Sequence, residues 1–437
     1  MKAHLRKLAS DLGETFWLVP GIIVVLGVIA AFGLVRVDRS GMLPDWLLSG
    51  WLYDGGATGA RTLLGAVASS TIGVAGTVFS ITIAGLSLAA GQMGPRLLRN
   101  FTRDRGNQIT MGIFLGTFSY ALVVLRSVRT RDEGEFVPHL SLSVGILLAF
   151  LCVVVLVYFV GHMAGRINVD TVVELVGEDV QRAIRRLAVQ EKGPAPPDAA
   201  MWRGAAPVMD SRRGYLQQFD ADALADWAAA QGAAIRLLVR PGDFIFPGAP
   251  IAVISPQTEG ADAAIRSATA LGSERAAADD MEFAVRQLVE VAVRALSPGI
   301  NDPHTAISVL DRLGAALCDM APLHLPSGVS VRDGRAVVVF PGFNYTGLTD
   351  TMFHMIRQNA GRSPAVLIRI LEVLTAVVSC EHEAERIGAL QRHADLVLGD
   401  AERQIATPAD LDDIRDRYRD FRIMRDHGPA QYVMVQS

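Results

Sequence analysis

Apolar residues are concentrated in four uncharged runs within the first 165 residues of the chain. Each run reaches the roughly 20 residues that an α-helix needs to cross a bilayer. The first run is too long for the apolar part of a usual cleavable signal sequence, so we interpret it as a helix that is retained. The pattern therefore predicts four transmembrane helices, at residues 15–35, 62–95, 106–125 and 136–165.

The rest of the chain has the patterning of a soluble protein. Residues 168–190 carry apolar side chains at helical spacing, and a Pro- and Ala-rich linker follows. Short alternating runs between residues 214 and 255 predict strands. Helical periodicity dominates from residue 276, apart from a hairpin turning at Asp333-Gly334, and it includes a long helical stretch at 365–398.

These patterns predict an α-helical membrane protein, with four transmembrane helices followed by a cytoplasmic α+β region. Four parts are expected along the chain. They are a transmembrane domain (1–165), a helical connector and linker (166–200), a small β-rich unit (201–260) and a mainly helical cytoplasmic domain (261–437).

The second apolar run is rich in small residues, whereas a simple membrane anchor is mostly Leu, Ile, Val and Phe. At about 100° per residue, its Gly, Ser and Thr residues fall along one side of a helix. Small residues at four-residue spacing allow close contact between helices; alternatively, the hydroxyl groups and exposed carbonyls could line a water-filled path. The predicted face consists of Ser69, Gly73, Gly76, Thr77, Ser80, Ala84, Ser87 and Gly91.

Charged residues set the expected orientation. No ionisable side chain lies within the second run, so neither a proton relay nor a tight metal site is expected there. By the positive-inside rule, the Lys and Arg residues place both termini in the cytoplasm. The arginines at the cytoplasmic mouth would favour anions, or they would only anchor the helix to anionic lipid. These arginines are Arg96, Arg99, Arg103 and Arg105.

Composition excludes several classes of function. The net charge of −4 is small and suggests no nucleic-acid partner. The three cysteines are far apart in the sequence and predict no disulfide framework, which agrees with a reducing compartment. No phosphate-binding loop, dinucleotide fingerprint or nucleophile elbow is present. We therefore predict no catalytic residues and no cofactor.

Two polar segments of the predicted soluble region are candidate binding sites. In the joint from Ser297 to Thr305, free backbone N–H groups with Asn301 and His304 could hold an anion. However, Asp302 would cap the following helix and repel an anion, so a purely structural joint is the alternative. The segment 381–385 offers His382 and acidic residues, with His393 further along. Because three converging ligands are not evident, we predict a solvated helix face and no metal site.

Three segments resemble one known family. They are GLSLAAGQMGPRLLRNF (85–101), GYLQQFD with RLLVRPGDF (214–220 and 236–244) and RALSPGINDPHTA (294–306). The layout resembles the bacterial family of predicted membrane proteins known as domain of unknown function 2254. This resemblance implies an inner-membrane protein with a cytoplasmic C-terminal region, and it supplies no catalytic residues.

Two functional hypotheses follow. The first is a homo-oligomeric ion channel or channel-like protein in the bacterial inner membrane, with a cytoplasmic regulatory domain. Its partners would be the lipid bilayer, further copies of the chain and an ion or small ligand. The alternative is a membrane-anchored sensor or scaffold whose cytoplasmic domain binds a ligand or protein at the joint around Asp302.

Overall fold

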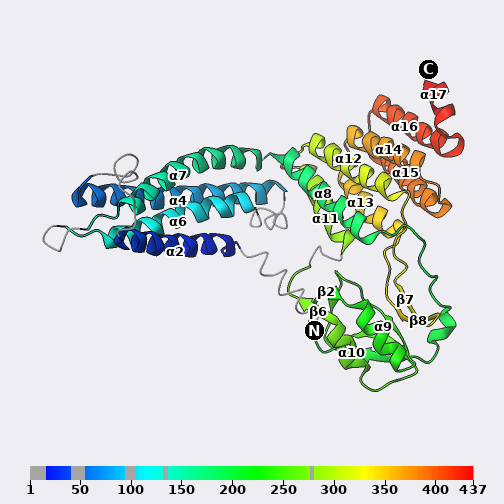
Figure 1. The fold of residues 1–437 in the computed structure, drawn as a ribbon. Helices are drawn as coiled ribbons and strands as arrows, with labels where there is room; N and C mark the ends of the chain where they lie inside the picture. Colours follow the sequence, from blue (N-terminus) through cyan, green and yellow to red (C-terminus); the bar gives the residue numbers. More distant parts are fainter. Residues whose placement is uncertain are drawn as a thin grey trace. The chain divides into compact units, whose positions relative to one another are not determined.

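Four long apolar helices come first in the computed structural model, which describes residues 16–40, 55–93, 104–130, 136–166, 168–275 and 280–436 (Figure 1). All four are long and apolar enough to cross a membrane, as the sequence predicted. They are α2 (Leu18–Ser40), α4 (Ala57–Met93), α6 (Arg105–Ser127) and α7 (His139–Arg166). These helices lie in one compact unit, and the chain from Val169 onward lies in the other.

Glycines allow α2 and α6 to approach closely. A Cβ atom added at Gly27 of α2 would lie only 2.7 Å from the carbonyl oxygen of Gly116 in α6. Gly112 and Gly116 are four residues apart, and both face Ile23 of α2. This is a small-xxx-small contact within one chain. The sequence pattern predicts such a contact for the second helix and does not indicate this one.

Acidic side chains fix the helix ends of the membrane unit. The carboxylate of Asp38 accepts hydrogen bonds from the backbone N–H groups of Leu140 and Ser141, at 3.0 and 2.9 Å, where α7 begins. At the other end, Asp104 caps α6 by accepting from the N–H of Gly106 at 3.0 Å. Negative charge at a helix N-terminus is favourable because of the unpaired N–H groups and the helix dipole.

Two sheets follow the connector helix α8 (Val169–Leu187) and a short 3₁₀ helix, η3 (Ala199–Trp202). One has the strand order β1-β5-β3-β8-β7, and the other has the order β4-β2-β6. All pairings are antiparallel except that of β3 with β8. The strands are β1 (Ala206–Met209), β2 (Gly214–Phe219), β3 (Ala234–Leu237), β4 (Phe244–Ile245), β5 (Pro250–Ser255), β6 (Thr269–Gly272), β7 (Val329–Arg332) and β8 (Arg335–Val339).

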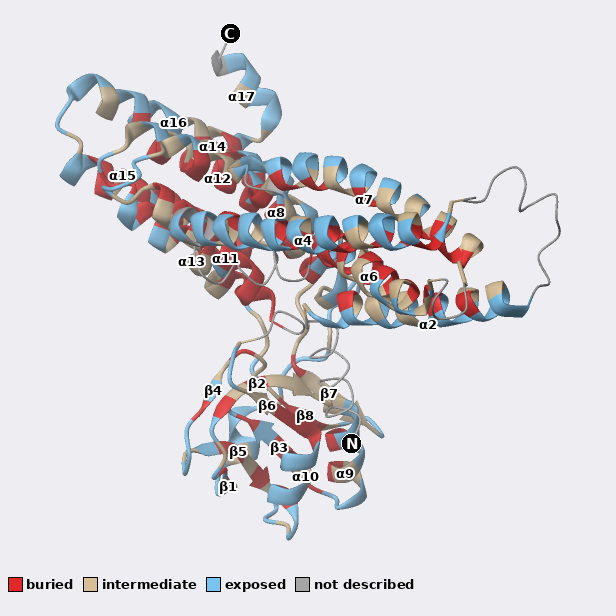
Figure 2. Cartoon of the chain, turned by 90° about the vertical axis from the view of Figure 1, so that its left-hand side faces the viewer, coloured by how far each residue is buried: buried red, intermediate tan, exposed pale blue. Residues whose placement is uncertain are grey.

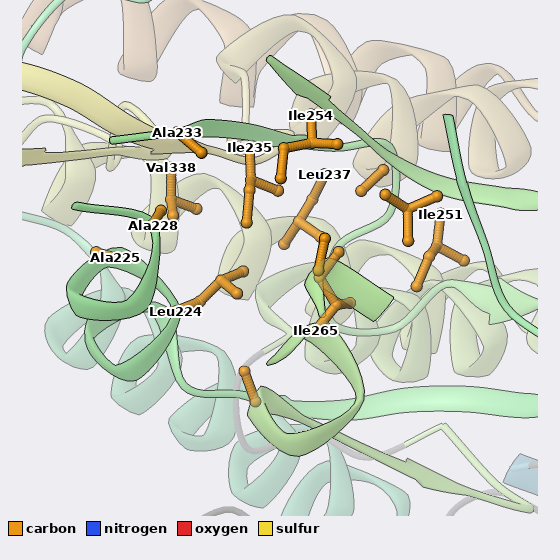
Figure 3. Packing of buried hydrophobic residues seen from close by; sticks show 14 of the residues in the cluster. Leu224, Ala225, Ala228, Ala233, Ile235, Leu237, Ile251, Ile254, Ile265 and Val338 are labelled. Atoms are coloured by element: carbon orange, nitrogen blue, oxygen red, sulfur yellow. The ribbon is translucent and has the colours of Figure 1, made fainter. Parts of the chain in front are cut away.

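The sheets extend beyond the expected boundary at residue 260. The predicted hairpin at Asp333-Gly334 is confirmed, but β8 pairs with β3, where Ile235 lies opposite Val338. Local periodicity does not reveal such a long-range parallel pairing. Helix α9 (Ala221–Ala230) covers this core, and its Leu224 points towards the strands (Figure 3). Helix α10 (Ala261–Ala268) contributes Ile265 to the same core.

The remaining helices bury apolar faces against one another (Figure 2). The expected helical stretch at 365–398 is in fact two helices. The break occurs because a carboxylate oxygen of Glu381 accepts the N–H groups of His382 and Glu383, at 2.9 and 3.1 Å. The helices are α11 (Met281–Ala295), α12 (Pro303–Met320), α13 (Tyr345–Asn359), α14 (Pro364–Cys380), α15 (Ala384–Gln404), α16 (Pro408–His427) and α17 (Pro429–Gln436).

Candidate functional site

The predicted small-residue face of α4 points away from the other described helices of its own chain. All eight of its positions are exposed, from Ser69 to Gly91. Apart from the backbone of α4 itself and the residues adjacent in the chain, no described atom lies within 4 Å of a Cβ placed at Gly73 or Gly76. The opposite side of α4 is buried, with Leu64 and Val78 in the core of the unit (Figure 2). Around Gly73 and Gly76, this face therefore makes no close contact with the side chains of other described residues.

Three of the hydroxyl groups on this face donate hydrogen bonds to carbonyl groups of α4 itself. Ser80 donates to the carbonyl of Gly76 at 2.9 Å, and Thr77 donates to the carbonyl of Gly73 at 3.2 Å. Ser69 donates to the carbonyl of Ala66, also at 3.2 Å. Donors satisfied in this way can be placed against lipid or against another helix without loss of a hydrogen bond.

Helices α2 and α7 present a different kind of surface. Their exposed side chains are large and apolar, such as Phe32 on α2 and Phe150 and Val157 on α7. Such side chains are typical of contact with lipid tails. On α4, large exposed residues such as Ile72 and Ile81 lie at the sides of the small-residue face. The centre of that face is a shallow strip that another helix can approach closely.

Three of the mouth arginines, Arg96, Arg99 and Arg103, lie outside the described residues. Arg105 is exposed and begins α6. Beside it, the buried Asp104 carboxylate lies 2.6 Å from Nε2 of His162 and joins α6 to α7. Sequence analysis did not predict this pair because the partners lie on different helices.

The joint around Asp302 has the geometry of a helix cap. The Asp302 carboxylate accepts the hydroxyl of Thr305 at 2.6 Å and the N–H groups of His304 and Thr305 at 3.1 and 3.2 Å. These bonds, led by the Thr305 hydroxyl, lower the pKa of Asp302. The carboxylate thus occupies the N–H groups that an anion would need. Asn301 and His304 are exposed beside it.

A cluster of three ionisable side chains joins α13 to α15. Asp350 and His354 lie one turn apart on α13, and His393 projects from α15. An oxygen of Asp350 lies 3.0 Å from Nε2 of His354 and 3.1 Å from Nε2 of His393. Arg392 also contacts this carboxylate. In the sequence, His393 pairs only with His382 on a common helix face, but the break between α14 and α15 separates those two histidines.

His393 is held in its neutral form. Its side chain is 0% exposed, and the rings of Phe353 and His354 lie against it. Burial lowers the pKa of His393 to about 4, and the nearby positive charge of Arg392 acts in the same direction. A neutral imidazole is the form that binds transition metals.

A pocket of about 580 Å³ lies elsewhere in the unit that begins at Val169. It is lined by the linker at 192–196 and by the loops at 325–327 and 342–344. Lys192 is the charged residue in this lining, and Phe343 contributes an aromatic ring. None of these lining residues is a carboxylate, histidine or cysteine, so the pocket does not have the ligands of a metal site.

Comparison with known proteins gives a consistent result. Residues 13–376 match the family DUF2254, described as a predicted membrane protein. The chain is 32% identical over 426 residues to the uncharacterized protein MT1328 of Mycobacterium tuberculosis, covering 93% of this chain and 80% of that protein. The uncharacterized protein Mb1321c of Mycobacterium bovis matches with the same identity and coverage. No solved structure matches the chain.

Proposed function

The chain belongs to the DUF2254 family of predicted membrane proteins, and from this premise we propose that it forms a homo-oligomeric, channel-like assembly through the outward face of α4. The observation that carries the proposal is the exposure of all eight small residues on that face. Lipid tails are as apolar as Leu, so membrane helices associate through close packing, which small residues permit. Copies of α4 arranged around an axis would bring this weakly polar face together.

The proposed location is the bacterial inner membrane, with both termini in the cytoplasm. Helical spans, rather than strands, support the inner membrane. The distribution of Lys and Arg supports cytoplasmic termini. Within the membrane unit, Asp104 lies beside His162, and Asp38 lies beside Ser141. The start of α6 and the end of α7 are therefore on the same side of the membrane. The unit from α8 onward would then act as the regulatory domain.

Conduction is tested with the purified full-length chain in planar bilayers. We expect discrete ion currents from the unmodified chain and a strong reduction in Ser80→Leu, because the larger side chain would project towards the axis. The matched control is Gly161→Leu on α7, where nothing lies within 4 Å of an added Cβ atom. A silent unmodified chain, or equal currents in both variants, would contradict the channel proposal.

A second function, a membrane-anchored sensor, is favoured by a different observation. The cap at Asp302 already uses the groups that a ligand would need there. The cluster of Asp350, His354 and His393 instead offers buried polar atoms without satisfied bonds. A sensor role would therefore centre on α13 and α15.

A further inference from the structure

The side chains of Asp350, His354 and His393 converge on one point between α13 and α15. One possible ligand atom from each residue lies within 4.8 Å of the other two. A tetrahedral metal site with bonds near 2.0 Å has ligand atoms separated by about 3.3 Å. The two nitrogen-to-oxygen distances, 3.0 and 3.1 Å, are close to that separation.

The cluster also leaves buried nitrogens unsatisfied. Neither ring nitrogen of His393 has a hydrogen-bond partner among the described residues, and the approach of Nε2 to Asp350 lacks hydrogen-bond geometry. Nδ1 of His354 is likewise unpartnered within the described part of the chain. Leaving a polar atom buried and unpaired lowers the stability of the folded chain. A cation bound by Nε2 of His393 would satisfy one of the two unpartnered nitrogens of that ring.

We propose that Asp350, His354 and His393 bind a divalent transition metal ion of the Zn²⁺ class. Two imidazoles and one carboxylate form a ligand set that Zn²⁺ accepts, with a fourth position left for water or another ligand. Hard cations such as Mg²⁺ and Ca²⁺ favour sites built wholly from oxygen, so they fit this set poorly. Neither the family nor the relatives assign a metal to this chain.

The positive charge of Arg392 affects how tightly such a site can bind a metal ion. Arg392 contacts the Asp350 carboxylate and competes with the metal for it. Its charge also opposes that of the incoming cation. The side chain of Arg392 is 41% exposed, so it can turn towards solvent when the metal binds. Removal of this charge should therefore strengthen metal binding, whereas loss of a ligand should weaken it.

The test measures Zn²⁺ binding to the full-length chain in detergent, without a polyhistidine tag, by equilibrium dialysis. We expect one tightly bound Zn²⁺ per chain and, with Co²⁺ in its place, visible absorption bands of a tetrahedral site. Asp350→Asn and His354→Gln should each weaken binding at least about tenfold. Arg392→Gln should tighten it, an effect that misfolding would not produce. The matched control is His382→Gln, in the exposed loop before α15.

Absence of Zn²⁺ binding by the unmodified chain would overturn the proposal. Undiminished binding in both Asp350→Asn and His354→Gln would also overturn it, because the ion would then be held elsewhere. The metal site does not depend on the α4 assembly. If the chain binds no Zn²⁺, the proposal of an α4 oligomer still stands. If the chain is monomeric, we still expect it to bind the ion.

Discussion

Gly76→Leu combined with Ser80→Leu is expected to convert the oligomer into monomers that remain folded. Both positions are exposed on α4, and no described atom lies within 4 Å of a Cβ added at Gly76. The added side chains therefore cause no clash inside one chain. In a close helix–helix contact, each would cost about 2 kcal/mol through overpacking, so the two together would weaken association roughly a thousand-fold.

The measurement is the mass of the detergent-solubilised protein, followed as the protein is diluted. The matched control is Gly161→Leu, an exposed glycine on α7 beside the large apolar side chains that suit lipid. This control should keep the mass of the unmodified assembly. If the double variant remains assembled, or if the control dissociates equally, the α4 face is not the contact between subunits.

Gly27→Leu is expected to destabilise the membrane unit itself. The first added carbon would lie 2.7 Å from the backbone oxygen of Gly116, and a backbone atom cannot move aside as a flexible side chain can. Helices α2 and α6 would have to separate. We expect a loss of about 3 kcal/mol, at the upper end of the usual overpacking costs. Thermal unfolding in detergent, followed by circular dichroism, measures the change.

Helix α2 supplies its own control for that experiment. Gly33 is exposed on the same helix, and nothing lies within 4 Å of a Cβ atom added there. Gly33→Leu should therefore unfold at nearly the temperature of the unmodified chain. Equal destabilisation by both substitutions would show that the effect comes from the helix and not from the contact with Gly116.

The helices and turns could be predicted where a local pattern determines them. The four spans follow from uncharged runs, and Asp302 caps α12 because an Asp-Pro pair suits a helix start. The hairpin at Asp333-Gly334 follows from two residues that tolerate positive φ angles. Their φ angles are 48° and 72°, respectively.

Contacts between distant segments could not be predicted in the same way. Gly27 and Gly116 meet only when α2 and α6 pack, and neither glycine is unusual in its own run. His382 and His393 lie in one stretch of helical periodicity, which predicts that both are on one face of a single helix. The break at Glu381 places His382 in a loop, so the two histidines do not share a helix face. The partners of His393 come from α13, and no spacing in the sequence indicates them.

The small-residue face of α4, in contrast, could be recognised from the sequence. Its alignment along one side of a helix was visible from residue spacing alone. The sequence did not indicate whether the face packs inside the chain, and the structure places it outside. The close packing of small residues within the chain belongs to α2 and α6 instead.

The most direct test is cross-linking of Ser80→Cys in native membranes with a short bismaleimide, which spans neighbouring helices about 8–10 Å apart. Cys318 and Cys380 are first replaced by Ser, and Cys152 stays because it is buried. Efficient formation of cross-linked pairs at position 80, with little at Gly161→Cys on α7, is the predicted result. Absence of pairs at position 80, or equal cross-linking at both positions, would contradict assembly through α4.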